Sequence, residues 1–92
     1  MSDLYTLSPE HIVLYGVGWC SDCHRARKVF AQSGVKYIDI DVDQDVKGSE
    51  FIIKINEGGR SVPTIVFPDG TTLTEPSNAV LAAKLEGYKQ TA

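Results

Sequence analysis

The sequence predicts an α/β domain whose elements follow the order β-α-β-α-β-β-α. Two observations support this order. Apolar runs rich in β-branched residues, typical of buried strands, recur at residues 11–17, 35–42 and 62–67. Between and after these runs, apolar residues recur at helical spacing. With 92 residues, the chain is long enough for one domain and too short for two.

The first half of the chain predicts a strand, a helix and a second strand. Residues 1–10 are polar and rich in turn formers, so we assign them to a short N-terminal extension and residues 11–92 to the domain. The strand at 11–17 leads into a helix that ends near Gly34, a residue suited to left-handed backbone. The alternation within 35–42 predicts the second strand. The apolar face of the helix comprises Ala26, Val29 and Phe30.

The second half predicts another helix, a hairpin and a last helix. Asp45 or Ser49 can cap the second helix. The strand at 62–67 returns through a Pro-Asp-Gly turn to a partner strand at 71–74. A Pro-Ser-Asn segment at 76–78 opens the last helix. The residues expected to face inward are Phe51, Ile52 and Ile55 in the second helix, and Val80, Leu81, Leu85 and Tyr88 in the last.

Composition and charge narrow the range of functions. The net charge is −3, and the 9 basic residues are scattered, so they do not form the basic surface that nucleic acids require. No apolar run approaches the roughly 20 residues of a membrane span, and residues 1–5 lack the features of a signal peptide. We therefore expect a cytoplasmic monomer with no nucleic-acid or membrane partner.

The chain has two cysteines, Cys20 and Cys23, placed where the first strand gives way to the first helix. A secreted domain stapled by disulfides would need more cysteines spread along the chain, so catalysis or metal binding is indicated. Unpaired N–H groups at the helix start favour the thiolate form of Cys20. Cys23, one turn later, is close enough to form a disulfide with it. Trp19 offers a flat face to a substrate.

Two metal-binding interpretations use the same residues. The segment from Cys20 to His24 matches the C-x-x-C-H signature of haem attachment, but no methionine other than Met1 is present to serve as the second axial ligand. Zinc needs four ligands, and Cys20, Cys23 and His24 supply three at best. We therefore assign no metal ligands and expect no metal.

Three segments together resemble the glutaredoxin superfamily, and within it the mycoredoxins and their bacterial relatives. They are Trp-Cys-x-x-Cys at 19–23, Gly-Arg-Ser-Val-Pro-Thr at 59–64 and Asp-Gly-Thr-Thr-Leu-Thr-Glu-Pro-Ser at 69–77. The resemblance covers residues 11–88. It implies a thioredoxin-like (glutaredoxin) fold, in which a four-stranded mixed sheet is flanked by helices.

The resemblance also implies a set of substrate-binding residues. It implies that Pro63 is a cis-proline facing the cysteines, which leaves the backbone of Val62 able to pair with an extended substrate. The glycine-rich turn that helps glutaredoxins bind glutathione is replaced by Thr-Glu-Pro-Ser, where backbone N–H groups near Pro76 and Ser77 can still hold a carboxylate. Arg60 is placed to offer a cation. Mycothiol, bacillithiol and glutathione are all candidate thiols.

These residues predict an enzyme that reduces mixed disulfides between proteins and a low-molecular-weight thiol through Cys20. The thiol is its co-substrate, and its expected partners are thiolated or disulfide-containing proteins and a thiol–disulfide reductase. Two alternatives stay open. One is a dithiol electron donor coupled to thioredoxin reductase, for example to ribonucleotide reductase. The other is a carrier of an iron–sulfur cluster or metal, because some glutaredoxins hold a cluster between two protomers.

Overall fold

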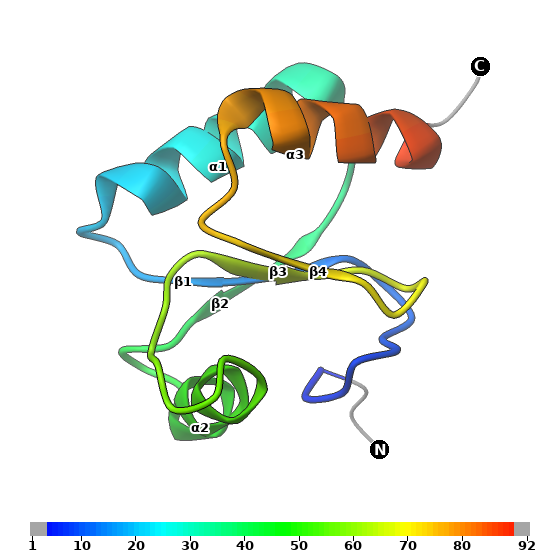
Figure 1. Cartoon of the computed structure of the whole chain (residues 1–92). Coiled ribbons are helices and arrows are strands. Elements are labelled where there is room, and N and C mark those ends of the chain that lie inside the picture. Colours follow the sequence, from blue (N-terminus) through cyan, green and yellow to red (C-terminus); the bar gives the residue numbers. More distant parts are fainter. Residues whose placement is uncertain (1–3, 90–92) are drawn as a thin grey trace.

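Four short strands form one mixed sheet in the computed structural model, which describes residues 4–89 (Figure 1). In the strand order β2-β1-β3-β4, β1 runs parallel to β2 and antiparallel to β3, and β4 is antiparallel to β3. The four strands are β1 (Val13–Gly16), β2 (Ile38–Asp41), β3 (Thr64–Val66) and β4 (Thr72–Thr74).

Helices cover both faces of this sheet. Figure 1 shows α1 and α3 on one face and α2 on the other. The helices are α1 (Ser21–Ser33), α2 (Val46–Ile55), α3 (Asn78–Leu85) and the short 3-10 helix η1 (Glu86–Tyr88). The predicted order of elements and the four-stranded mixed sheet flanked by helices are both confirmed. Among residues 4–89, no helix is long and apolar enough to cross a membrane.

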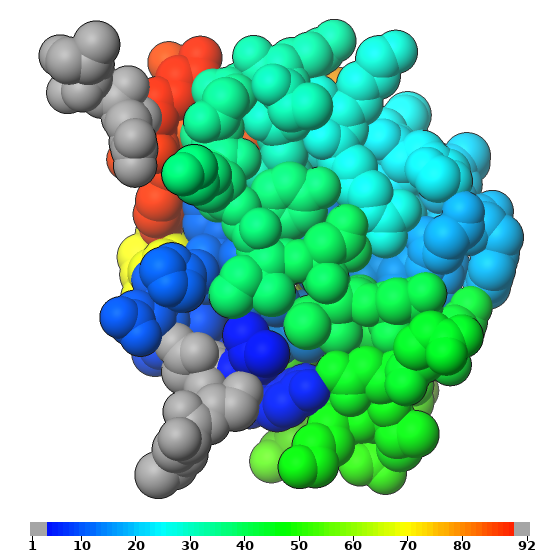
Figure 2. All heavy atoms as spheres, turned by 180° about the vertical axis from the view of Figure 1, so that it is seen from behind, coloured from blue at the N-terminus to red at the C-terminus, as the bar shows by residue number. Residues whose placement is uncertain are grey.

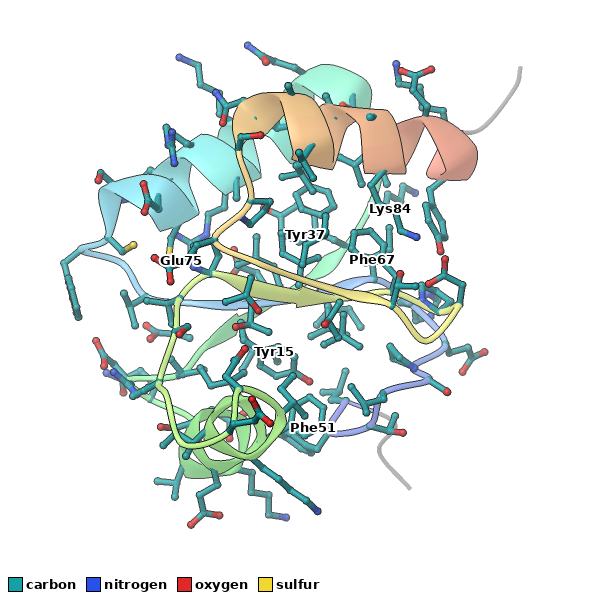
Figure 3. All side chains as sticks on the ribbon, in the orientation of Figure 1. Tyr15, Tyr37, Phe51, Phe67, Glu75 and Lys84 are labelled. Carbon is teal, nitrogen blue, oxygen red and sulfur yellow. The ribbon has the colours of Figure 1, made fainter. Side chains whose placement is uncertain are left out.

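The core consists of two clusters, one on each face of the sheet, because successive strand residues point to opposite faces. Along β1, Leu14 packs toward α1 and α3, whereas Tyr15 packs toward α2. Figure 3 shows Phe67 on the first of these sides. It shows Tyr15 and Phe51 on the other, where their ring centroids lie 5.4 Å apart. All of β1 is buried, which explains why the sequence there is apolar without alternation.

The strands are shorter than the apolar runs that predicted them. The second strand begins at Ile38 rather than Val35, because the N–H of Val35 bonds to the carbonyl of Phe30 and belongs to the end of α1. β3 begins at Thr64, after Pro63, because proline has no N–H to give to the sheet. The pattern therefore located each strand but overestimated its length.

The prediction that Val80 faces inward is wrong. Leu81 and Leu85, one helical turn apart, are buried as predicted, but Val80 is 51% exposed. One turn after Val80, Lys84 reaches across the surface to Asp69, with 2.7 Å between Nζ and Oδ2. The eight residues of α3 bury only a narrow stripe that includes Leu81 and Leu85, and Val80 lies outside it.

The predicted N-terminal extension packs against the domain where it is described. Leu4 and Tyr5 contact the core cluster on the α2 side, and the Tyr5 hydroxyl donates to Asp45 Oδ2 at 2.6 Å. Figure 2 shows the dark blue start of the described chain lying against the green α2 region. Asp45 is also the N-cap of α2, where it accepts from the N–H of Gly48, so one of the two predicted caps is confirmed.

Candidate active site

Three connecting segments meet at one end of the sheet, on the left in Figure 1. Residues 17–20 join β1 to α1, residues 56–63 join α2 to β3, and residues 75–77 join β4 to α3. These segments contain all of the predicted site residues except Cys23, which lies in the first turn of α1. Loops held by a rigid sheet and helices are where binding and catalytic side chains usually lie.

Cys20 is the N-cap of α1. Its backbone is extended, with φ −97° and ψ 122°, and its Sγ accepts from the N–H of Cys23 at 3.3 Å. An N-cap acceptor satisfies a backbone donor that the helix leaves unpaired, and a thiolate is a stronger acceptor than a thiol. The half-buried Sγ also lies 3.9 Å from the carbonyl of Val62. Cys20 Sγ therefore lies at the helix start, between the N–H of Cys23 and the carbonyl of Val62, and still contacts solvent.

Cys23 is in the opposite environment, because its side chain is fully buried in the core cluster on the α2 side. Burial raises the pKa of the Cys23 thiol to about 11, and the nearby Cys20 adds to that rise. The backbone N–H of Val17 and the guanidinium of Arg27 oppose part of it. The two thiols therefore differ in access, and the pKa of the buried one is raised.

The peptide bond between Val62 and Pro63 is cis, which confirms the isomer expected for Pro63. Pro63 is buried, Val62 is half-buried, and the Val62 carbonyl is the group that faces Cys20. The carbonyl of Pro63 accepts from the N–H of Glu75 at 2.9 Å. The two carbonyls of this dipeptide thus make different contacts: that of Val62 faces Cys20, and that of Pro63 bonds to the turn before α3.

The turn before α3 holds the remaining predicted contacts. Glu75 has φ 48°, in the left-handed region that glycine usually occupies, and Figure 3 shows it at the same end of the sheet. Pro76 follows it, half-buried. Ser77 is the N-cap of α3, where its hydroxyl accepts from the N–H of Val80 at 3.1 Å. The start of α3 is therefore fixed beside the cis dipeptide.

Trp19 and Arg60 converge on a residue that the sequence did not single out, Asp43. The Trp19 indole is 73% exposed, yet its Nε1 donates to Asp43 Oδ2 at 2.7 Å. Arg60 donates to Asp43 Oδ1 at 2.8 Å and also to the Val42 carbonyl and the Ser49 hydroxyl, each at 2.9 Å. Asp43 stands in an acidic run, and nothing in that run distinguishes it from its neighbours.

This contact gives a test based on pH. The guanidinium of Arg60 and then the indole of Trp19 hold the pKa of Asp43 below its ordinary value of 3.8. The carboxylate, and with it the contact to Trp19, should therefore persist as pH falls through 3.8 and be lost only at lower pH. Trp19 is the sole tryptophan, so its fluorescence emission reports this titration directly.

Replacing Arg60 with Gln should move that fluorescence midpoint upward, because it removes the largest cause of the lowered pKa. The control is Arg25→Gln, which removes an exposed arginine that pairs with Asp22 instead. Identical midpoints for Arg60→Gln and the wild-type protein would contradict this account of the network.

His24 lies on the exposed side of α1, and its Nε2 is 2.7 Å from the carbonyl of Gly18. Within residues 4–89, no group of three or more His, Cys, Asp or Glu side chains is arranged to hold a metal ion. The described site thus consists of two thiols, a tryptophan, a cis dipeptide and a helix start.

A thiol pair at the start of a helix, beside a cis dipeptide and on a four-stranded mixed sheet, defines a protein of the thioredoxin-like class. Residues 12–71 match the family model of the glutaredoxins. Mycoredoxin 1 of Corynebacterium glutamicum is 38% identical over 84% of this chain and 95% of its own. A Mycobacterium tuberculosis protein named as a glutaredoxin is 35% identical over 80% of this chain and 88% of its own.

Solved structures agree on the fold. A wheat glutaredoxin covers 85% of this chain with a TM-score of 0.65 at 18% identity, and 74% of its own chain is covered. A buckwheat glutaredoxin in complex with glutathione covers 89% of this chain with a TM-score of 0.64 at 23% identity, with 74% of its own chain covered.

The chain therefore belongs to the glutaredoxin family, and it is a glutaredoxin-like thiol–disulfide oxidoreductase. The two alternatives considered from the sequence, a dithiol electron donor and a carrier of clusters or metals, are not favoured by these relatives.

Proposed function

We propose that the protein reduces mixed disulfides between proteins and a low-molecular-weight thiol, using Cys20 as its nucleophile. The observation that carries this proposal is the inequality of the two thiols. Cys20 caps a helix and contacts solvent, whereas Cys23 is buried and has a raised pKa. A single accessible thiolate is sufficient for this reaction, because the small thiol itself can complete the cycle.

The reaction proceeds in two exchanges. The thiolate of Cys20 attacks the small-thiol sulfur of the mixed disulfide, so the bond from that sulfur to the protein substrate breaks and the protein leaves as a thiolate. A second molecule of small thiol, as its thiolate, then attacks that same small-thiol sulfur, now bonded to Cys20. The products are a disulfide of the small thiol and the regenerated Cys20 thiolate. A thiol–disulfide reductase returns that disulfide to the thiol.

The substrate contacts follow from the segments around Cys20. The backbone of Val62 pairs with an extended substrate, as a strand pairs with a sheet edge. The exposed face of Trp19 packs against the substrate on the other side of the sulfur. Backbone N–H groups at the helix start near Pro76 and Ser77 donate hydrogen bonds to polar groups of the small thiol. The charge of Arg60 is balanced by Asp43, which also bonds to Trp19. We therefore propose that Arg60 positions Asp43 and Trp19 rather than binding the substrate itself.

We further propose that the site favours an uncharged small thiol. The carboxylate of Glu75 is exposed at the turn beside the Cys20 site, and the cation expected to meet a substrate carboxylate, Arg60, is paired with Asp43. Glutathione and bacillithiol carry carboxylates that Glu75 repels, whereas mycothiol does not. The similarity to a mycoredoxin supports the same preference.

The test uses one carrier protein thiolated in turn with glutathione, bacillithiol or mycothiol, each assayed with its own thiol as reductant. We expect the highest kcat/KM with the mycothiol adduct. Glu75→Gln should raise kcat/KM for the two anionic thiols by about two- to fivefold, the effect of one screened surface charge, and leave mycothiol unchanged. The control is Glu86→Gln, at the start of η1 and directly after the far end of α3.

If the wild-type protein reduced none of the three thiolated carriers, the proposed reaction would be wrong. Equal gains for all three thiols in Glu75→Gln would overturn the electrostatic preference alone.

A further inference from the structure

Two side chains of α1 meet at Gly16, at the end of β1. The Sγ of Cys23 lies 3.0 Å, and the Nη2 of Arg27 3.2 Å, from the position that a Cβ on Gly16 would occupy. The two atoms are therefore within about 6 Å of each other, the range over which a cation favours an ionised neighbour. Because Gly16 has no side chain, the thiol of Cys23 and the guanidinium of Arg27 can both approach this point of β1.

Arg27 is held firmly in this place. It stands four residues after Cys23, so both side chains lie on one face of the helix. Its Nη1 donates to the Val17 carbonyl at 3.1 Å. Its Nε and Nη2 donate to the two carboxylate oxygens of Asp39 on β2, at 2.7 and 3.3 Å. The guanidinium thus has Asp39 as its ionic partner while Nη2 also approaches Cys23.

Cys23 needs help to act as a nucleophile, because full burial disfavours its thiolate. The groups that act on its ionisation are the neighbouring Cys20, the backbone N–H of Val17 and the guanidinium of Arg27. Of these, Arg27 is the one that carries a positive charge. The reaction proposed above gives neither Cys23 nor Arg27 a role.

We infer that Arg27 is a positioning residue for the disulfide closure that the cysteine spacing already predicts, the step in which Cys23 bonds to Cys20 and releases the small thiol. The inference rests on the proposed function, since it starts from the mixed disulfide that Cys20 forms. Arg27 acts by its charge, which increases the fraction of Cys23 present as thiolate. The small thiol bound to Cys20 is then released without attack by a second small-thiol molecule.

The step is a simple exchange. The Cys23 thiol loses its proton to solvent, and its thiolate attacks Cys20 Sγ. A bond forms between the two Sγ atoms, the bond from Cys20 to the small-thiol sulfur breaks, and the small thiol leaves as a thiolate that is protonated by solvent. Two further molecules of the small thiol reduce the internal disulfide and return both cysteines to the dithiol form.

The experiment is a stopped-flow reaction of the reduced protein with an excess of dipyridyl disulfide. This uncharged reagent releases one coloured pyridinethione when Cys20 attacks it and a second when Cys23 closes the internal disulfide. The first phase depends on reagent concentration and reports the nucleophile of the proposed function. The second phase is independent of reagent concentration and reports the inference.

Four variants separate charge from structure. Arg27→Gln keeps a donor for the Val17 carbonyl but removes the charge. It should slow the second phase about three- to tenfold at pH 7, because a smaller fraction of Cys23 is then thiolate. The higher nucleophilicity of that thiolate offsets part of the loss. Arg27→Lys keeps the charge but loses the bidentate pairing, and it should restore a rate near that of the wild-type protein. Asp39→Asn removes the counter-charge and should leave the second phase at least as fast as wild type. Lys28→Gln, an exposed neighbour, is the matched control.

The first phase should stay within about twofold of wild type in all four variants, which also shows that the site is folded. A second phase that is equally slow in Arg27→Gln, Arg27→Lys and Asp39→Asn would mean that Arg27 acts only through its hydrogen bonds, and the inference would be wrong. An unchanged second phase in Arg27→Gln would also overturn it. Absence of the first phase in the wild-type protein would instead overturn the proposed function.

Discussion

Cys20→Ser is expected to abolish reduction of protein mixed disulfides, a loss of at least about a thousandfold, because it removes the sulfur that we propose as the nucleophile. Cys23→Ser is expected to keep a rate within about threefold of wild type when the small thiol is in excess. The difference follows from the structure, in which Cys20 caps α1 beside the Val62 carbonyl and Cys23 is fully buried.

The measurement is the steady-state rate of each variant on a thiolated protein, with the matching small thiol and its reductase present. Ser21→Ala is the control for a change at the start of the same helix, because Ser21 is the first residue of α1 and is exposed. A Cys23→Ser variant as inactive as Cys20→Ser, with all three candidate thiols tried, would replace the single-thiol mechanism by one that needs both cysteines.

Iodoacetamide should alkylate Cys20 at least about a hundredfold faster than Cys23. Iodoacetamide reacts with thiolates, and at pH 7 a thiol whose pKa is about 11 is almost entirely protonated. Cys23 is also fully buried, so the reagent has little access to it. We expect native protein at pH 7 to gain one adduct, on Cys20, as seen by intact mass and peptide mapping.

The pH dependence of alkylation tests whether the pKa of the Cys23 thiol is raised or lowered. Because its pKa is raised, the thiolate fraction should still increase about tenfold per pH unit between pH 7 and 10. In Cys20→Ser, alkylation of Cys23 should therefore accelerate throughout this range. A plateau below pH 9, or two adducts at equal rates in the wild-type protein, would contradict the raised pKa of Cys23.

The parts of the fold that the sequence predicted are those with a local cause. Apolar residues without alternation predicted the buried strand β1, and alternating aspartates predicted the half-exposed β2. Gly34 ends α1 with φ 69°, as its position indicated. The placement of the cysteine pair at a strand-to-helix junction was predictable for the same reason, since a helix start and its cap are set by adjacent residues.

The features that escaped prediction depend on contacts between distant segments. Asp43 bonds to Trp19 and Arg60, which are 24 and 17 residues away, and an acidic run on a surface contains no signal for such partners. Arg27 belongs to a cluster of basic residues on α1, and its pairing with Asp39 becomes visible only when β2 is placed beside β1. Side-chain pairing between elements thus required the structure.

In the proposed reaction, Cys20 alone takes up the small thiol from the substrate. The most direct measurement mixes Cys23→Ser with a stoichiometric amount of thiolated carrier protein, without free small thiol, quenches with acid and records intact masses. We predict a variant heavier by one small thiol, together with carrier protein in its free thiol form. A covalent complex between the variant and the carrier would contradict the account, because it would mean that Cys20 attacks the carrier's sulfur and depends on Cys23 for release.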